Sequence, residues 1–151
     1  MIRTLTVSGT NVTDQWKYHF DSSCDNDSYS YDATFSSLSI GDEYTDDGYG
    51  SSGGSGHQFT MTIDTNTYTS LSASDLTWVN DNSFCGETGW ELNTAKDVAG
   101  KTCGPHDWDS VNTKRLSVYK NESSTTIKFG DFNLESSGYP SGINSNVYTK
   151  Q

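Results

Sequence analysis

The residues best suited to ligand chemistry lie in one stretch of the chain, from Trp78 to Asp109. This stretch holds three of the four tryptophans and two of the three cysteines. An indole ring gives a wide apolar face for stacking, and short polar side chains beside it can pair with hydroxyl groups. We therefore expect a surface for a hydroxyl-rich ligand. The candidate ligand-binding residues are Trp78, Asn80, Asp81, Asn82, Trp90, His106, Asp107 and Trp108.

The three tryptophans of this stretch differ in their surroundings. Trp90 and Trp108 stand among glycine, proline, histidine and aspartate, which favours exposed loops and makes these two rings the stronger candidates for stacking. Trp78 lies between Thr77 and Val79 in a segment that is equally compatible with a buried strand, because tryptophan is well buried on average. Its assignment stays open between the core and a ligand surface.

A second group of candidate residues is acidic. Nine acidic residues and no lysine or arginine lie between Asp21 and Asp64. Carboxylate oxygens on a flexible, glycine-rich loop suit the oxygen coordination that Ca²⁺ prefers. The candidate metal ligands are Asp42, Glu43, Asp46 and Asp47. The spacing of a helix–loop–helix calcium site is absent, and a well-solvated acidic loop is the alternative.

Known catalytic motifs are absent from the sequence, so an enzymatic function ranks behind binding. Two carboxylates, Glu87 with Asp107 or Asp109, could serve a glycoside hydrolase if the fold brought them together. The segment from Cys103 to His106 offers one close pair of zinc ligands, where a structural zinc site usually shows two. The nucleophile elbow of serine hydrolases and the glycine-rich phosphate loops are also missing.

Length and composition limit the classes of protein. The chain has 151 residues, 31% of them hydrophobic, and a net charge of −11. We expect a single domain over residues 1–151, with a thin core that relies on aromatic rings. The negative charge argues against nucleic acids and anionic membranes as partners. No stretch approaches the ~20 apolar residues of a membrane span, so membrane insertion is not expected.

The cysteines bear on the compartment in which the protein folds. Cys85 and Cys103 flank a glycine-containing segment, and a disulfide between them would close a loop and leave Cys24 unpaired. Three reduced thiols are the alternative, because an odd number of cysteines is weak support for pairing. Polar residues interrupt the first segment, Met-Ile-Arg-Thr-Leu, so a signal peptide is not expected there. Composition and three Asn-X-Ser/Thr sequons nevertheless favour an extracellular, secreted protein.

Alternation of apolar and polar residues predicts β-strands over most of the chain. Residues 15–20, 59–63 and 115–119 show the period of two that is typical of half-buried strands. About nine short strands, separated by long polar loops, predict an all-β fold. We expect an antiparallel β-sandwich of the jelly-roll type.

Local signals place the turns and one helix. Gly41–Gly56 is the longest expected loop, and a bulge or a bend is expected at Ser36-Ser37. Asp64–Asn66 and Lys120–Ser124 are expected to be hairpin turns. Leu92–Ala99 is the one segment expected to be helical, with Gly100 as its stop.

Taken together, these features favour a non-catalytic carbohydrate-binding domain of the lectin or carbohydrate-binding-module type. A glycan or polysaccharide would be its partner, and Ca²⁺ is a candidate cofactor. A structural or assembly domain, as in a matrix, fibre or capsid, is the alternative, because abundant Ser, Thr, Asn and Gly also suit β-rich assemblies. A small glycan-active hydrolase is the third hypothesis. Fold class by itself does not choose among them.

Overall fold

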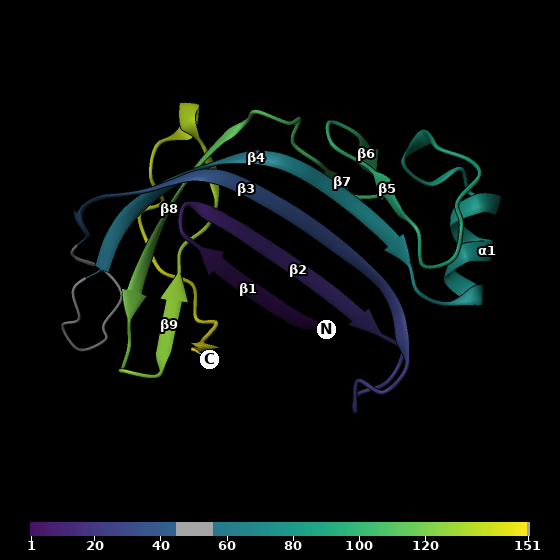
Figure 1. Cartoon of the computed structure of the whole chain (residues 1–151), viewed down its shortest axis with the longest axis horizontal. Coiled ribbons are helices and arrows are strands. Elements are labelled where there is room, and N and C mark those ends of the chain that lie inside the picture. Colours follow the sequence, from purple (N-terminus) through teal and green to yellow (C-terminus); the bar gives the residue numbers. More distant parts are fainter. Residues whose placement is uncertain (45–55, 151) are drawn as a thin grey trace. The chain divides into compact units, whose positions relative to one another are not determined.

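The computed structural model describes residues 1–44 and 56–150, and strands dominate it (Figure 1). The strands are β1 (Ile2–Ser8), β2 (Asn11–His19), β3 (Asp27–Tyr44), β4 (Gly56–Ser70), β5 (Ala95–Asp97), β6 (Thr102–Cys103), β7 (His106–Asp107), β8 (Lys114–Asn121), β9 (Thr126–Phe129), β10 (Asn133–Leu134) and β11 (Tyr148–Thr149). One α-helix, α1 (Ala73–Asp81), and two 3-10 turns, η1 (Phe84–Gly86) and η2 (Glu135–Ser137), complete the elements.

A nine-stranded sheet follows the order β1-β2-β3-β4-β8-β9-β11, with β5 paired to β4 and β10 paired to β8. β6 and β7 form a separate hairpin. Neighbouring strands in this sheet run antiparallel. The predicted all-β, antiparallel fold class is therefore confirmed.

The chain divides into two compact units by its contacts. Unit 1 comprises Met1–Ser36 and Ile63–Thr113, and unit 2 comprises Ser37–Thr62 and Lys114–Gln151. The first part of β3 and the last part of β4 belong to unit 1, and the rest of both strands belongs to unit 2. In β3 the boundary between the units falls between Ser36 and Ser37. The φ of Ser37 is +57°, in the left-handed region. The backbone irregularity predicted at Ser36-Ser37, as a bulge or a bend, is therefore present at Ser37. One domain over residues 1–151 stays a prediction.

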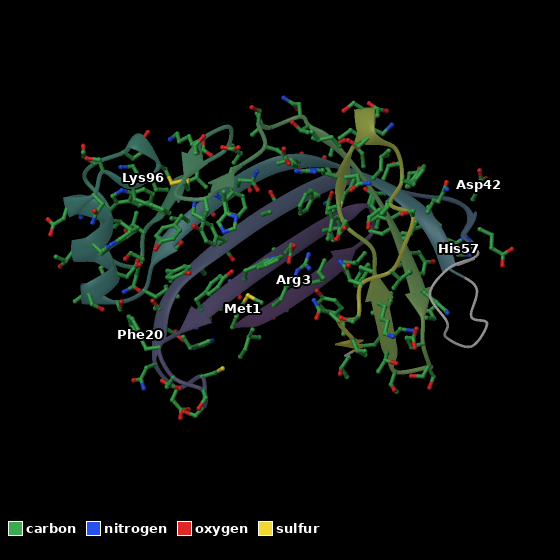
Figure 2. All side chains as sticks on the ribbon, turned by 180° about the vertical axis from the view of Figure 1, so that it is seen from behind. Met1, Arg3, Phe20, Asp42, His57 and Lys96 are labelled. Atoms are coloured by element: carbon green, nitrogen blue, oxygen red, sulfur yellow. A yellow bond between two sulfur atoms is a disulfide. The ribbon has the colours of Figure 1, made fainter. Side chains whose placement is uncertain are left out.

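Strand register gathers the aromatic rings of unit 1 on one face of its sheet. Tyr18 on β2 lies opposite Tyr29 on β3, and Trp16 lies opposite Tyr31. At the outer strand, the guanidinium of Arg3 (labelled in Figure 2) lies 4.4 Å from the Trp16 ring centroid. Aromatic residues at every second position of neighbouring strands thus form a continuous aromatic layer. Such a layer supplies the apolar surface that few aliphatic residues would otherwise leave missing.

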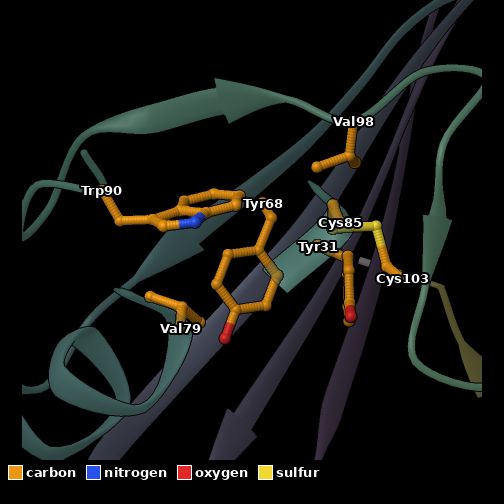
Figure 3. Close-up of a cluster of buried hydrophobic side chains, with 7 residues drawn as sticks. All are labelled: Tyr31, Tyr68, Val79, Cys85, Trp90, Val98 and Cys103. Atoms are coloured by element: carbon orange, nitrogen blue, oxygen red, sulfur yellow. A yellow bond between two sulfur atoms is a disulfide. The ribbon is translucent and has the colours of Figure 1, made fainter. Parts of the chain in front are cut away.

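The segment after β4 covers part of this layer and completes the core of unit 1 (Figure 3). The buried cluster consists of Tyr31, Tyr68, Val79, Cys85, Trp90, Val98 and Cys103. Tyr68 is central: its ring centroid lies 5.0 Å from that of Tyr31 and 5.4 Å from that of Trp90. The core therefore depends on ring-to-ring packing across elements that are distant in sequence.

The helix lies at Ala73–Asp81, so the helix predicted at Leu92–Ala99 is wrong. The Ser72 hydroxyl accepts a hydrogen bond from the Asp75 backbone N–H at 3.2 Å and caps the helix. The Asp75 carboxylate in the first turn favours the same end electrostatically. Within 92–99, residues 95–97 form β5 and pair with β4. Pairing with β4 therefore determines the structure of residues 95–97, in place of the helix that the local sequence favours.

The hairpin turn predicted at Asp64–Asn66 is also wrong, because β4 runs through it. Asp64 and Thr65 are both exposed, and the alternation of burial changes phase at this pair. Their hydroxyl and carboxyl groups find cross-strand partners: Asp64 accepts from the Ser36 hydroxyl at 2.7 Å. Turn-forming residues here produce an irregularity within a strand and do not reverse the chain.

Unit 2 has its own core and confirms the second predicted turn. Buried side chains of β4 and β8 pack there, namely Phe59, Met61, Leu116 and Val118. β8 ends at Asn121 and β9 begins at Thr126, so the reversal at residues 122–125 overlaps the predicted Lys120–Ser124 turn. Of the loop predicted at Gly41–Gly56, residues 41–44 belong to β3 and Gly56 begins β4, and residues 45–55 lie outside the described residues.

Candidate functional site

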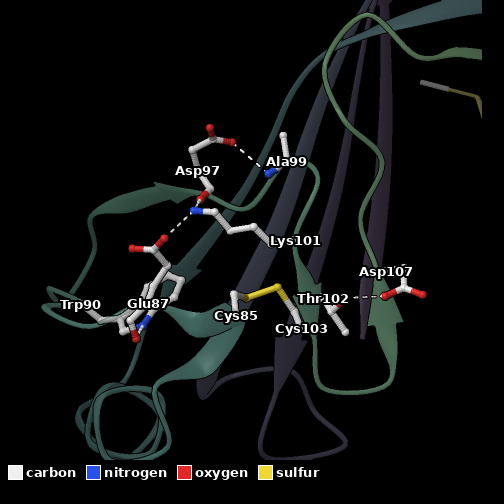
Figure 4. Close-up of a disulfide and its surroundings, with 9 residues drawn as sticks. All are labelled: Cys85, Glu87, Trp90, Asp97, Ala99, Lys101, Thr102, Cys103 and Asp107. Carbon is white, nitrogen blue, oxygen red and sulfur yellow. Dashed lines mark hydrogen bonds and ion pairs between the residues drawn. A yellow bond between two sulfur atoms is a disulfide. The ribbon is translucent and has the colours of Figure 1, made fainter.

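A disulfide joins Cys85 to Cys103, as the sequence suggested (Figure 4). It links η1 to β6 and so fixes the β6–β7 hairpin beside the segment that follows α1. Cys24 is a free, half-buried cysteine. Disulfides of this kind persist in oxidising compartments.

Trp78 lies at the surface, with 51% of its area exposed. Asp81 and Asn82 follow it at helical spacings of three and four residues, and both are exposed. Residues so spaced share one face of a helix. The Asn82 side chain donates to the Trp78 carbonyl oxygen at 2.8 Å and closes the helix end. Three of the eight predicted ligand-binding residues therefore lie together at the C-terminal end of α1.

Phe84 packs between the C-terminal end of α1 and the core. Its ring centroid lies 5.4 Å from that of Trp78 and 5.1 Å from that of Tyr68 in the core. A Cβ at Gly104, in the turn of the β6–β7 hairpin, would lie 3.9 Å from the Phe84 ring. Phe84 thus contacts the helix end, the core and the hairpin turn. We call Trp78, Asp81, Asn82, Phe84 and Gly104 the Trp78 surface.

His106 and Asp107 are exposed on β7, in the hairpin whose turn contacts Phe84. The Asp107 carboxylate accepts a hydrogen bond from the Thr102 hydroxyl at 2.7 Å, which fixes its position on the hairpin (Figure 4). The disulfide and Phe84 together attach this hairpin to the segment that carries Trp78. Both residues remain accessible for polar contacts.

Trp90 is buried and Asn80 is half-buried, and the two residues stabilise the fold. Trp90 is 4% exposed, and its ring belongs to the core cluster. The Asn80 side chain accepts from the Trp90 backbone N–H at 2.9 Å and donates to the Trp90 carbonyl oxygen at 3.1 Å. This two-way bridge holds the chain after η1 against α1. In this structure neither side chain offers a free face to a ligand.

Trp108 is half-buried and stacks on Tyr31, with ring centroids 4.5 Å apart. Its indole N–H is shielded from solvent and has no hydrogen-bond partner. The ranking of the tryptophans as candidates for ligand stacking therefore reverses. Trp90 and Trp108 have the sequence neighbours of loop residues, yet their rings pack against the core. Trp78, whose assignment was open, is the exposed one. A residue whose backbone lies in a loop can still place a large ring in the core.

The carboxylate of Glu87 lies between two lysines. Lys101 Nζ is 2.8 Å from one carboxylate oxygen (Figure 4). Lys96 Nζ is 3.6 Å from the other. The hydrogen bond and positive charge of Lys101, and then the charge of Lys96, lower the pKa of Glu87. A general acid in glycoside hydrolysis needs a raised pKa. The shift at Glu87 runs in the opposite direction and suits a structural ion pair.

The predicted metal ligands are only partly described. Asp42 and Glu43 are exposed near the end of β3, and Asp46 and Asp47 lie outside the described residues. Within residues 1–44 and 56–150, no group of three or more histidine, cysteine or acidic side chains is arranged to hold a metal ion. Calcium therefore stays a prediction.

Two residues that support the candidate site were not identified from the sequence. Neither Phe84 nor Gly104 is a residue type that marks a ligand site. Each is the sequence neighbour of a disulfide cysteine, Cys85 or Cys103. That adjacency was the available signal: once the disulfide forms, neighbours of its two cysteines lie close together.

No protein-family model matches the chain, and no curated protein sequence matches it. Among the described residues, no helix is both long enough and apolar enough to cross a bilayer.

Proposed function

We propose that this protein binds carbohydrate without catalysis, and that the Trp78 surface is its contact site. The observation that carries the proposal is the exposed indole of Trp78 beside exposed Asp81 and Asn82. A solvent-facing indole on a rigid element can stack on the apolar face of a sugar ring. Neighbouring carboxylate and amide groups can then pair with ring hydroxyls. His106 and Asp107 would add polar contacts from the hairpin.

Rigidity supports this assignment. Phe84 holds the Trp78 ring against the core, and the Cys85–Cys103 disulfide attaches the hairpin beside it. A preformed site loses little conformational entropy when a ligand binds. Exposed large apolar residues are common on proteins, so the argument rests on the combination of exposure, support and polar neighbours. The same disulfide is the basis for proposing that the protein acts outside the cell.

The test compares Trp78→Ala with Phe20→Ala on a panel of immobilised glycans. Phe20, the residue that follows β2 (Figure 2), is 61% exposed and serves as the matched control for loss of an exposed aromatic ring. We expect Trp78→Ala to weaken binding by about tenfold or more, the loss of about 1.4 kcal/mol. Because the ring is exposed, we expect the free energy of unfolding to fall by less than about 1 kcal/mol.

Intrinsic fluorescence of the same proteins, with calcium and with chelator, completes the experiment. A saturable change with one class of sugar in the wild-type protein and in Phe20→Ala, but not in Trp78→Ala, supports the proposal. Loss of the change in chelator would support calcium assistance. The proposal fails if the wild-type protein retains no glycan, or if both variants bind one equally well.

An assembly function is the second candidate, and the outer strand of unit 1 favours it. β1 is the first strand in the sheet order and, among the described residues, pairs with β2 only. Its seven residues contain no proline, and an open edge of this kind is a template for another strand. Sedimentation at micromolar concentrations distinguishes the two functions: self-association with no glycan retention would favour assembly.

A further inference from the structure

We propose that the Trp78 surface selects sugars that carry a positive charge, such as the glucosamine units of a deacetylated amino-sugar polymer. This inference rests on the proposed function, because it names the class of carbohydrate that the same surface takes. Its basis lies within unit 1: the exposed indole of Trp78, the carboxylates of the same site, and the ion pairs that already occupy every lysine and arginine of the unit.

The basic residues of unit 1 are all engaged. Segment 71–95, which contains α1 and η1, has four acidic residues and neither lysine nor arginine. Unit 1 as a whole has four lysine and arginine residues, and each forms an ion pair. The pairs are Arg3–Asp14, Lys17–Asp27, Lys96–Glu87 and Lys101–Glu87. No base of unit 1 is therefore left to neutralise the carboxylates of the Trp78 surface.

Two carboxylates of the site lack a basic partner. Asp81, three residues after Trp78 on α1, is exposed, and so is Asp107 on β7. Among residues 1–44 and 56–150, neither forms an ion pair. Asp107 accepts a hydrogen bond from the neutral Thr102 hydroxyl, which holds the carboxylate in place without neutralising it (Figure 4). Fixed negative charges at the helix end and on the hairpin attract a cation and repel an anion.

The indole of Trp78 adds a second attraction for a cation. The face of a tryptophan ring is electron-rich and attracts an ammonium or guanidinium group within about 6 Å of the ring centroid. Two other tryptophans of unit 1 already have such a cation: Lys96 Nζ lies 4.9 Å from the Trp90 centroid, and the Arg3 guanidinium lies against Trp16. All four bases of the unit are paired elsewhere, so the exposed ring of Trp78 is open to the cation of a ligand.

An amino sugar matches this combination of groups. Its pyranose ring can stack on the Trp78 indole, and its ammonium group is attracted by the ring and by Asp81 and Asp107. The amide oxygen of Asn82 can accept a hydrogen bond from a ring hydroxyl. A neutral sugar gains the stacking but not the charge interaction, and a uronic acid or sulfated sugar is repelled. Charge therefore distinguishes the ligand that this surface prefers.

The test measures dissociation constants of four tetrasaccharides of equal length by calorimetry. Their units are glucosamine, at a pH where its amine is protonated, N-acetylglucosamine, glucose and glucuronate. We expect glucosamine to bind about tenfold more tightly than N-acetylglucosamine, because acetylation removes the charge and keeps the ring. Glucuronate should bind most weakly. The preference for glucosamine should shrink between about 0.01 M and about 1 M NaCl. A lysine tetrapeptide, which has similar charge and no sugar ring, is the control for charge alone.

Two variants of equal net charge test the part played by the site carboxylate. Asp81→Asn keeps the size of the side chain and should weaken glucosamine binding by about fivefold, with N-acetylglucosamine binding unchanged. Asp81 is the last residue of α1, where the helix dipole disfavours negative charge, so this variant should fold. Asp25→Asn is the matched control, because Asp25 is an exposed acid in the loop between β2 and β3. It should change neither affinity.

The outcomes separate this inference from the proposed function. If neutral sugars bind as tightly as glucosamine and Trp78→Ala abolishes their binding, the inference is overturned and the proposed function stands. The inference is also overturned if the lysine tetrapeptide binds as tightly as glucosamine, or if Asp81→Asn and Asp25→Asn have equal effects. If no sugar of any charge binds the wild-type protein, the proposed function fails with it.

Discussion

Tyr68 shows at the scale of a single residue how an aromatic core satisfies its polar atoms. Its hydroxyl oxygen lies 2.7 and 2.8 Å from the two carboxylate oxygens of Asp75, and the Ser70 hydroxyl also donates to Asp75. A buried phenol needs such a partner, because an unpaired hydroxyl in the core is costly. The acid at the start of α1 therefore serves two purposes: it favours the helix end and accepts hydrogen bonds from the core.

The tyrosine cluster predicts a loss of stability at alkaline pH. Burial raises the pKa of Tyr31 and Tyr68 well above the ordinary value of about 10, and Asp75 adds to the shift at Tyr68. Their protonated form is therefore favoured in the folded state. Stability from these groups is complete below the unfolded pKa and falls as pH rises above it. We expect the urea midpoint to fall above pH ~10.

Ultraviolet absorbance of tyrosinate checks this prediction independently. Tyr31 and Tyr68 should ionise only as the protein unfolds, while more exposed tyrosines ionise earlier. Titration of all nine tyrosines in a protein that is still folded, with one ordinary pKa, would contradict it.

At the scale of elements, the β6–β7 hairpin depends on its attachments. Each of its strands has two residues, and a hairpin of that size is not stable alone. The disulfide attaches it to η1. At the open end of the hairpin, the Trp108 backbone N–H donates to the Lys101 carbonyl oxygen at 2.9 Å, which joins the residues that flank β6 and β7. Lys101 in turn donates to Glu87 and to the Asp97 carbonyl oxygen, each at 2.8 Å (Figure 4).

Removal of the disulfide should therefore destabilise the protein. A bond between residues 18 apart in sequence contributes about 3 kcal/mol when its main effect is to restrict the unfolded chain. We expect the double variant Cys85→Ala, Cys103→Ala to lose about that much free energy of unfolding in urea. Cys24→Ser is the control and should change it by less than about 1 kcal/mol, because Cys24 is unpaired and partly exposed. Equal stability of the double variant and the control would argue against the bond.

At the scale of the whole molecule, charge is unbalanced. Twenty acidic residues face nine basic ones, and several bases are already used in ion pairs such as Arg3–Asp14 and Lys114–Glu135. The remaining acids repel one another in the compact state more than in the expanded chain. This repulsion favours solubility at a cost in stability.

Salt should therefore stabilise the protein at neutral pH. Between about 0.01 M and about 1 M NaCl the screening length falls from about 30 Å to about 3 Å, so repulsion between distant acids disappears. We expect the urea midpoint at pH 7 to rise over this range. The same titration near the sequence pI of about 4.3 is the control, because little net charge remains to be screened. A midpoint that falls with salt at pH 7 would show that attractive pairs dominate.

Features of the fold that repeat along the chain were predictable from the sequence. Alternation of apolar and polar residues records which side chains share a face of a strand, and it predicted the antiparallel all-β class. The spacing of Cys85 and Cys103 pointed to their disulfide, and the polar run at Lys120–Ser124 to a turn. The strands and the turn depend on near neighbours in sequence, which is why local patterns reveal them. The disulfide joins residues 18 apart in sequence, and the number and spacing of the cysteines pointed to it.

The burial of individual rings was decided only by the tertiary structure. Trp90 is buried because Asn80, ten residues earlier, bridges its backbone, and Trp108 packs inward because the register of β3 places Tyr31 beneath it. The helix formed at Ala73–Asp81 because a cap and core contacts of α1 act together, whereas residues 95–97 found a sheet partner in β4. Strand register likewise places Lys120 on β8 opposite Lys128 on β9. Each outcome depends on partners distant in sequence, and local propensity does not specify them.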